Sequence, residues 1–334
     1  MKRRCHVVLS YFVIVLAFAQ PGENRAQEAL ASTGSAGSFT GTTEAEAGAT
    51  SAKKAATQSA TSTKPKPARR TSARKAPKQF TGSDETPLLS REVPSTGAKA
   101  VMILDAANGQ VLYEKNADAL RPPASTQKLL TALLVAERGF LDRPVRVEPI
   151  DTYAEPVKLN IRPGDEYQRI DLLRALLVKS PNDVARCLAR DYAGSVEAFA
   201  QVMNQRAREI GATNSNFVNP NGLPNPNQYS TARDLALIAR AAYTNPTIRS
   251  IVRMPKIIFR YANGHTRELQ NTNKVLRRSP YCNGMKTGYT EAAGHCLIAS
   301  GSRPGRDVIV VVLGDSKTGV WRDASALLSW GLWM

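Results

Sequence analysis

The sequence predicts an α+β fold in which an antiparallel sheet is completed by both ends of one domain, with helices on it and a helical subdomain inserted between. Strand-like segments occur close to residue 100 and again after residue 254, and the region between them has helical periodicity. A final helix, expected at 319–332, follows the last strands. Both ends of the domain would therefore contribute to the same sheet.

The first 96 residues are expected to lie outside this domain. Residues 2–4 are basic, and the apolar run after them ends in an Ala-x-Ala site at 17–19, which is typical of a secretory signal peptide over 1–19. The run is shorter than the roughly 20 residues of a membrane span, and an uncleaved anchor is the alternative. Residues 20–96 are rich in Ala, Ser, Thr, Lys and Pro, which predicts a disordered basic linker. The folded, catalytic domain would then be 97–334.

Basic residues in the linker supply much of the formal net charge of +17. A basic tail of this kind can neutralise nucleic-acid phosphates without reading sequence. Because an export signal precedes it, we expect no nucleic-acid partner and a location in the periplasm or cell envelope. The linker would either be a solvated spacer or contact anionic envelope polymers.

Each element of the domain has a local signal. A pair of strands over 100–117 should turn at Asn108-Gly109, and a second hairpin over 254–270 should turn at Asn263-Gly264. A buried helix should follow Pro122-Pro123, and Ser180-Pro181 should separate two further helices. The remaining helices are expected at 170–179, 183–194, 196–211 and 230–244, and the remaining strands at 283–290, 295–302 and 307–315.

Three cysteines follow the predicted signal peptide, so at least one of them is unpaired. Cys282 and Cys296 are equally distant from Tyr289, and a hairpin centred there could bring them opposite each other. A cross-strand disulfide is therefore one alternative. Two buried thiols are the preferred interpretation.

Ser125 and Lys128 are the first candidates for chemistry. They stand three residues apart at the start of an apolar helix, so their side chains share one face. A charged lysine is costly in such surroundings unless something compensates it. The S-x-x-K pattern alone is weak, because Ser51 and Ser72 in the linker also have a lysine three residues on. A helix cap with an outward-pointing lysine would explain an isolated pair.

Two further polar clusters give this pair its context. Ser180-Pro181-Asn182 lies at a helix–helix junction, and Lys286-Thr287-Gly288 lies on a predicted strand. Each has an ordinary explanation, since a serine before proline suits a helix N-cap and a second Lys-Thr-Gly occurs at 317–319. In this order, the three clusters form the set found in penicillin-binding proteins and serine β-lactamases.

From about Lys99 to the C-terminus, the chain resembles the low-molecular-mass penicillin-binding proteins, the serine-type D-alanyl-D-alanine carboxypeptidases. Blocks such as "LLRALLVKSPNDVA" and "NGMKTGYTEAAGHCLIAS" extend the likeness beyond the motifs, and Pro181 inside the second motif is a departure. The resemblance implies a serine β-lactamase/DD-peptidase-like fold that needs no metal or cofactor. It implies removal of the terminal D-alanine from peptidoglycan stem peptides through a serine acyl-enzyme, and acylation by β-lactams.

The resemblance also implies a set of catalytic residues. Ser125 would attack the penultimate D-alanine carbonyl, and Lys128 would be its base if burial and the nearby cation of Lys286 lower its pKa. Ser180 would relay a proton to the leaving amine. Asn182 would bind a substrate amide and orient the catalytic lysine.

The strand motif would bind the substrate. Backbone N–H groups of Ser125 and Tyr289 would hold the oxyanion. Lys286 and Thr287 would bind the terminal carboxylate of the peptide. Gly288 would leave room for the peptide to lie along the strand edge as an added strand.

The sequence also bears on four alternatives. A D,D-endopeptidase that cuts peptidoglycan cross-links fits the same residues. A class A-like β-lactamase would need a deacylating glutamate, but Glu155–Asn160 precedes Ser180 instead of following it. A catalytically dead envelope-binding protein is the non-enzyme alternative. A Ser-His-Asp hydrolase lacks its G-x-S-x-G motif, and His265 and His295 are expected to be structural.

Overall fold

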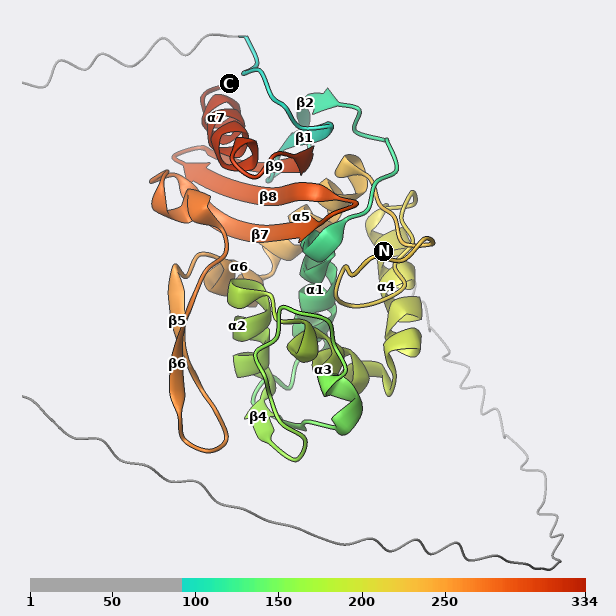
Figure 1. Ribbon diagram of the computed structural model, residues 1–334. Helices are drawn as coiled ribbons and strands as arrows, with labels where there is room; N and C mark the ends of the chain where they lie inside the picture. Colours follow the sequence, from blue (N-terminus) through green and yellow to red (C-terminus); the bar gives the residue numbers. More distant parts are fainter. Residues whose placement is uncertain (1–91) are drawn as a thin grey trace, which may run out of the picture. The chain divides into compact units, whose positions relative to one another are not determined.

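The computed structural model describes residues 92–334, shown as the coloured part of Figure 1. The predicted signal peptide and nearly all of the predicted linker lie outside these residues. Within 92–334, no helix combines the length and apolar character needed to cross a membrane.

A five-stranded antiparallel sheet organises the domain, as the sequence predicted. Its first strand in the chain, β1, pairs with its last, β9, so both ends of the domain build the sheet. The edge opposite β2 is formed by β7, which carries the Lys-Thr-Gly motif. The spatial order is β2 (Val111–Lys115), β1 (Ala100–Asp105), β9 (Arg306–Asp315), β8 (Gly294–Arg303) and β7 (Cys282–Thr290).

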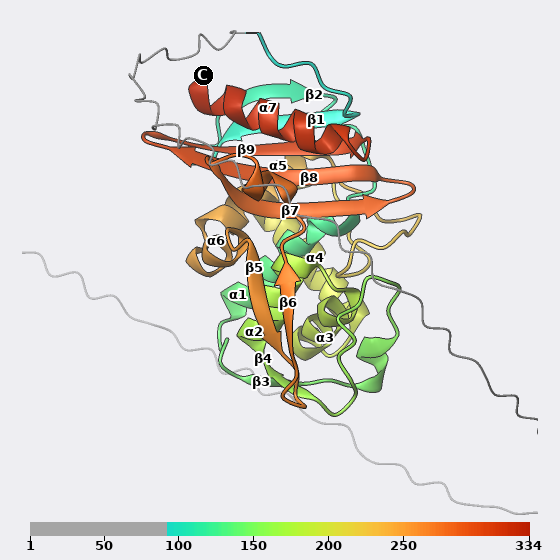
Figure 2. The same cartoon turned by 60° about the vertical axis from the view of Figure 1, so that its left-hand side comes forward.

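Both faces of the sheet are covered, which explains the continuous apolar run of β9. Val308, Val310 and Val312 pack with the last helix, α7 (Gly319–Trp333), while Ile309 and Val311 belong to the core shared with the other helices. Alternate residues of a strand point to opposite faces, so a sheet buried on both sides needs apolar residues throughout. Figure 2 shows α7 lying across one face, with the helical block on the other side.

The helical block has the predicted helices, with ends shifted by only a few residues. Side-chain caps fix two of its N-termini, because Ser195 accepts from Ala198 N and Thr231 accepts from Asp234 N. Helix α6 was not anticipated, although Asn245-Pro246 is a cap followed by a first-turn proline. The helices are α1 (Lys128–Arg138), α2 (Arg169–Lys179), α3 (Asn182–Ala193), α4 (Val196–Ile210), α5 (Ala232–Thr244) and α6 (Pro246–Val252).

Short elements complete the domain. Strands β5 (Lys256–Arg260) and β6 (Thr266–Gln270) form the predicted second hairpin, and Gly264 takes a positive φ of 84° in its turn. Its neighbour in space, the two-stranded pair β3 (Pro144–Arg146) and β4 (Glu166–Gln168), was not predicted. The 3₁₀ turns are η1 (Ala124–Gln127), η2 (Pro149–Thr152) and η3 (Lys274–Arg277).

The disulfide alternative for Cys282 and Cys296 is wrong. All three cysteines of the described chain are buried free thiols. The β7–β8 hairpin turns between Thr290 and Gly294, beyond the assumed centre at residue 289, so Cys282 pairs with Gly301 and Cys296 with Gly288. The two sulfur atoms therefore lie at different levels of the hairpin, and the preferred interpretation of two buried thiols is confirmed.

Candidate active site

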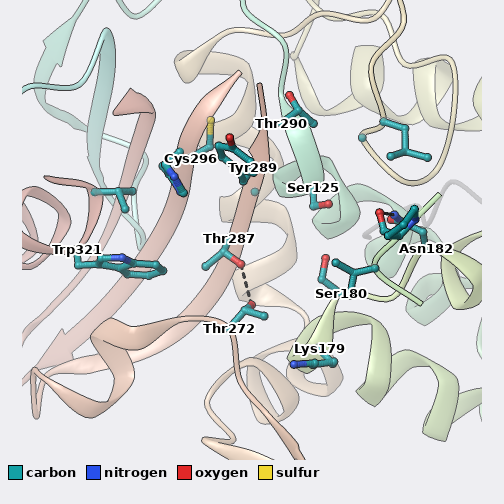
Figure 3. Close-up of a pocket in the computed structure, with 17 residues that line it drawn as sticks. Ser125, Lys179, Ser180, Asn182, Thr272, Thr287, Tyr289, Thr290, Cys296 and Trp321 are labelled. Carbon is teal, nitrogen blue, oxygen red and sulfur yellow. Dashed lines mark hydrogen bonds between the residues drawn. The ribbon is translucent and has the colours of Figure 1, made fainter. Parts of the chain in front are cut away.

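A cleft of about 350 Å³ lies beside the free edge of β7 (Figure 3). It brings together Ser125 from η1, Ser180 and Asn182 from the α2–α3 junction, and residues 287–289 of β7. These are six of the eight residues predicted for the site. The other two, Lys128 and Lys286, are buried and do not line the cleft.

Ser125 occupies a tight turn directly before α1. Residues 124–127 form the 3₁₀ turn η1, and α1 begins at Lys128, so the serine stands just outside the α-helix. Its Oγ donates to the carbonyl of Asn221 at 3.2 Å and lies 2.9 Å from Lys128 Nζ. The hydroxyl is thus within hydrogen-bond distance of an amine that could accept its proton.

Lys128 is the most deeply placed residue of the site. Its side chain is fully buried, and its Nζ donates to Asn182 Oδ1 at 2.7 Å. Burial, and then the positive charge of Lys286, hold the Lys128 pKa well below its usual value, while the Asp183 carboxylate acts in the opposite direction. The expected lowering of this pKa is confirmed. It favours the neutral amine, the form that can act as a base.

Lys286 is buried, although its expected role requires a positive charge. Its Nζ donates to the backbone carbonyl of Thr287 at 2.9 Å, and burial lowers its pKa to about 7. The positive charge of Lys286 in turn contributes to the lowered pKa of Lys128. Burial therefore works against the positive charge expected of Lys286.

The α2–α3 junction places the second motif. Ser180 ends α2 in the left-handed conformation, with φ of 68°, and Pro181 is the N-cap of α3, so the N-cap interpretation of Ser180 is wrong. A C-terminal residue in this conformation reverses the chain sharply between two helices. The turn points both motif side chains at the cleft, and Ser180 Oγ is buried without a hydrogen-bond partner among residues 92–334.

Asn182 and Asp183 anchor the loop on the far side of the cleft. Asn182 Nδ2 donates to the carbonyls of Glu155 and Pro156, each at 3.1 Å, so this amide is already engaged instead of free for a substrate. Asp183 is fully buried and accepts from Leu159 N and Asn160 N at 3.0 and 2.7 Å. The Glu155 backbone thus contributes to the site, while its side chain is exposed and does not line the cleft.

Two glycines allow the chain to close around the serine. A Cβ on Gly288 would lie 2.8 Å from Ser125 N, and one on Gly222 would lie 1.9 Å from the carbonyl oxygen of Ala124. Gly222 also has a positive φ of 83°. Gly288 was predicted to leave room for a peptide, and the structure gives it a further role in seating the turn that carries Ser125.

Sequence reasoning missed several residues that line the cleft. Thr272 Oγ1 lies 2.7 Å from Thr287 Oγ1, and Trp321 and Lys179 border the same cleft. His295, expected to be structural, also lines it and stacks on Tyr289 with ring centroids 4.3 Å apart. The pairing of these two residues across the β7–β8 hairpin would have been found from the correct turn position. No local pattern marks the others.

The site defines the class to which the chain belongs. A serine beside a buried lysine, an asparagine bonded to that lysine, and a Lys-Thr-Gly strand at the cleft edge are the arrangement of serine DD-peptidases and other penicillin-binding enzymes. A family profile described as D-alanyl-D-alanine carboxypeptidase, Peptidase S11, matches residues 88–317. The chain belongs to this family.

Individual relatives support the same family assignment. D-alanyl-D-alanine carboxypeptidase DacB2 of Mycobacterium tuberculosis is 35% identical over 255 residues, covering 75% of this chain and 87% of the relative. A D-alanyl-D-alanine endopeptidase of Escherichia coli is 34% identical over 242 residues, with coverages of 71% and 78%. A crystal structure of a D-alanyl-D-alanine carboxypeptidase from M. tuberculosis superposes with a TM-score of 0.69 at 34% identity, covering 73% of this chain and 94% of that one.

Proposed function

We propose that this protein removes the terminal D-alanine from peptidoglycan stem peptides through an acyl-enzyme on Ser125. The observation that carries the proposal is the contact of Lys128 Nζ with both Ser125 Oγ, at 2.9 Å, and Asn182 Oδ1, at 2.7 Å. A serine hydroxyl is a weak nucleophile unless a base takes its proton, and a lysine with a lowered pKa is such a base. The same serine would be acylated by β-lactams.

The first half-reaction forms the acyl-enzyme. Ser125 Oγ attacks the carbonyl carbon of the penultimate D-alanine while its proton passes to Lys128. The backbone N–H groups of Ser125 and Tyr289 stabilise the oxyanion. When the tetrahedral intermediate collapses, the C–N bond breaks, and the proton reaches the leaving amine through the Ser180 hydroxyl. Asn182 holds the lysine amine in place throughout.

Hydrolysis completes the cycle. A water molecule gives its proton to the neutral Lys128 amine and attacks the ester carbonyl of the acyl-enzyme. The intermediate then collapses, the serine oxygen recovers a proton from the lysine, and the shortened peptide leaves. The substrate lies along the free edge of β7, where Gly288 and Thr287 line the cleft.

Family membership indicates action on the cell wall, and we propose export by the N-terminal 1–19 segment followed by release into the periplasm or envelope. The basic segment within 20–96 would act as a spacer or contact anionic envelope polymers. Cleavage of peptidoglycan cross-links is the second candidate function, because an endopeptidase of E. coli is among the relatives.

Product analysis on defined muropeptides tests this function. We expect the purified full chain to release D-alanine from monomeric pentapeptide muropeptides, detected as loss of one alanine by mass spectrometry. The Ser125→Ala variant is the matched control and should release none. Cleavage confined to cross-linked dimers would establish the endopeptidase instead. If the wild type leaves both substrates unchanged, the proposed function is wrong.

A further inference from the structure

Lys179 lies at the cleft, and the proposed mechanism assigns it no role. It is the last residue of α2, directly before Ser180, and its side chain is half-buried at the cleft wall. Figure 3 shows it along the lower end of the cleft, below Ser180, with its ammonium group on the side of Thr272. Within residues 92–334, it forms no ion pair and no side-chain hydrogen bond.

The backbone ties this lysine to the hydroxyl pair across the cleft. Thr272 N donates to the carbonyl of Val178, the residue before Lys179, at 3.0 Å. Thr272 Oγ1 in turn lies 2.7 Å from Thr287 Oγ1 on the motif strand. The ammonium and the two hydroxyls therefore belong to one end of the cleft, and all three residues line it. The bond between the two hydroxyls uses one of their protons and leaves the other free for a ligand. A hydroxyl donor beside a cation is a suitable pair for a carboxylate.

Other cations are less suited to this end of the cleft. Lys286 does not line the cleft, and its Nζ is engaged by the Thr287 carbonyl at 2.9 Å. The Lys274 ammonium lies over the Trp321 ring, 5.2 Å from its centroid. His295 has a pKa below its usual value because of burial and the charges of Lys317 and Lys274, which leaves it neutral at neutral pH. Lys179 is the sole lysine or arginine among the described residues that line the cleft.

We propose that Lys179 is a substrate-binding residue whose ammonium group holds the C-terminal carboxylate of the peptide, together with the one hydroxyl proton that the Thr272–Thr287 pair leaves free. The proposal deepens the proposed function and rests on it. It gives the three lysines of the site three different tasks. Lys128 takes up and returns protons, and the charge of Lys286 favours the neutral form of Lys128. Lys179 binds the carboxylate that marks a free D-alanine terminus.

A penicillin and its methyl ester distinguish these tasks, because they differ only in whether the carboxylate is free. The second-order rate constant of acylation is measured by mass spectrometry of the full chain with both compounds. We expect Lys179→Gln to slow acylation by the free acid about 10- to 100-fold and to leave the ester within about twofold, as befits the loss of one charged hydrogen bond. Lys179→Arg should restore most of the rate with the acid.

Lys158→Gln is the matched control, since Lys158 is an exposed lysine near the same cleft and does not line it. It should change neither rate. For the wild type, raising the ionic strength should lower the ratio of the acylation rate with the acid to the rate with the ester, because salt screens the attraction between the ammonium and the carboxylate. Equal losses with acid and ester, or no loss with either, would overturn the assignment of Lys179. A wild type that reacts with neither compound would instead refute the proposed function, and this inference with it.

Discussion

Replacing Ser125 with alanine should reduce D-alanine release from pentapeptide by about 10⁴-fold or more, since it removes the hydroxyl that lies 2.9 Å from the amine of Lys128. The change removes one oxygen atom from a half-buried side chain, together with its contacts to Asn221 O and Lys128 Nζ. Its effect on folding should be small, and thermal unfolding checks this directly. Turnover is followed by coupled detection of free D-alanine.

Ser51 and Ser72 provide controls for this prediction, because each also begins an S-x-x-K sequence. Alanine at either position should leave turnover unchanged. An active Ser125→Ala variant, with D-alanine release near the wild-type rate, would exclude the serine as nucleophile.

Lys128→Arg should lower the acylation rate constant by about 10³-fold, the usual contribution of a positioned general base. Arginine keeps the positive charge but does not lose its proton in a protein, so it cannot take the proton of Ser125. The wild-type rate should rise with pH as Lys128 is deprotonated, with an apparent pKa below 10.5, because burial and Lys286 both favour the neutral amine. The variant should not show this rise.

Lys286→Arg is the comparison, since Lys286 acts on Lys128 through its positive charge and does not need to lose a proton. It should retain more acylation than Lys128→Arg. Equal losses in the two variants, or the same pH profile in wild type and Lys128→Arg, would refute the division of roles between these lysines. Stopped-flow acylation with a fluorescent penicillin measures both quantities.

The fold could be predicted from the sequence where local patterns have one interpretation. Asn263-Gly264 specified a hairpin turn, Ser180-Pro181 specified a break between two helices, and the apolar run at 307–315 specified a strand. The β7–β8 turn was misplaced because no such dipeptide marks it. The centre assumed at Tyr289 was wrong by a few residues, which produced the incorrect cysteine alternative.

The part of the candidate site that consists of motif residues was predicted from the sequence. The pattern places Ser125, Lys128, Asn182 and the motif strand, and the structure brings them together. Thr272 could not be found in this way, since its position depends on packing between distant segments. The low pKa of Lys286 was also out of reach, because burial decides it and the burial of one side chain depends on the whole fold.

Mass mapping of a β-lactam adduct on the wild-type protein tests the central claim most directly. Incubation with penicillin, proteolysis and fragment sequencing should place one ring-opened penicillin on the peptide containing Ser125, with a mass increase equal to the full mass of the drug. The adduct should persist, because no deacylating glutamate lines the cleft among residues 92–334. An adduct at another residue, or rapid catalytic turnover of penicillin with no adduct, would contradict the account.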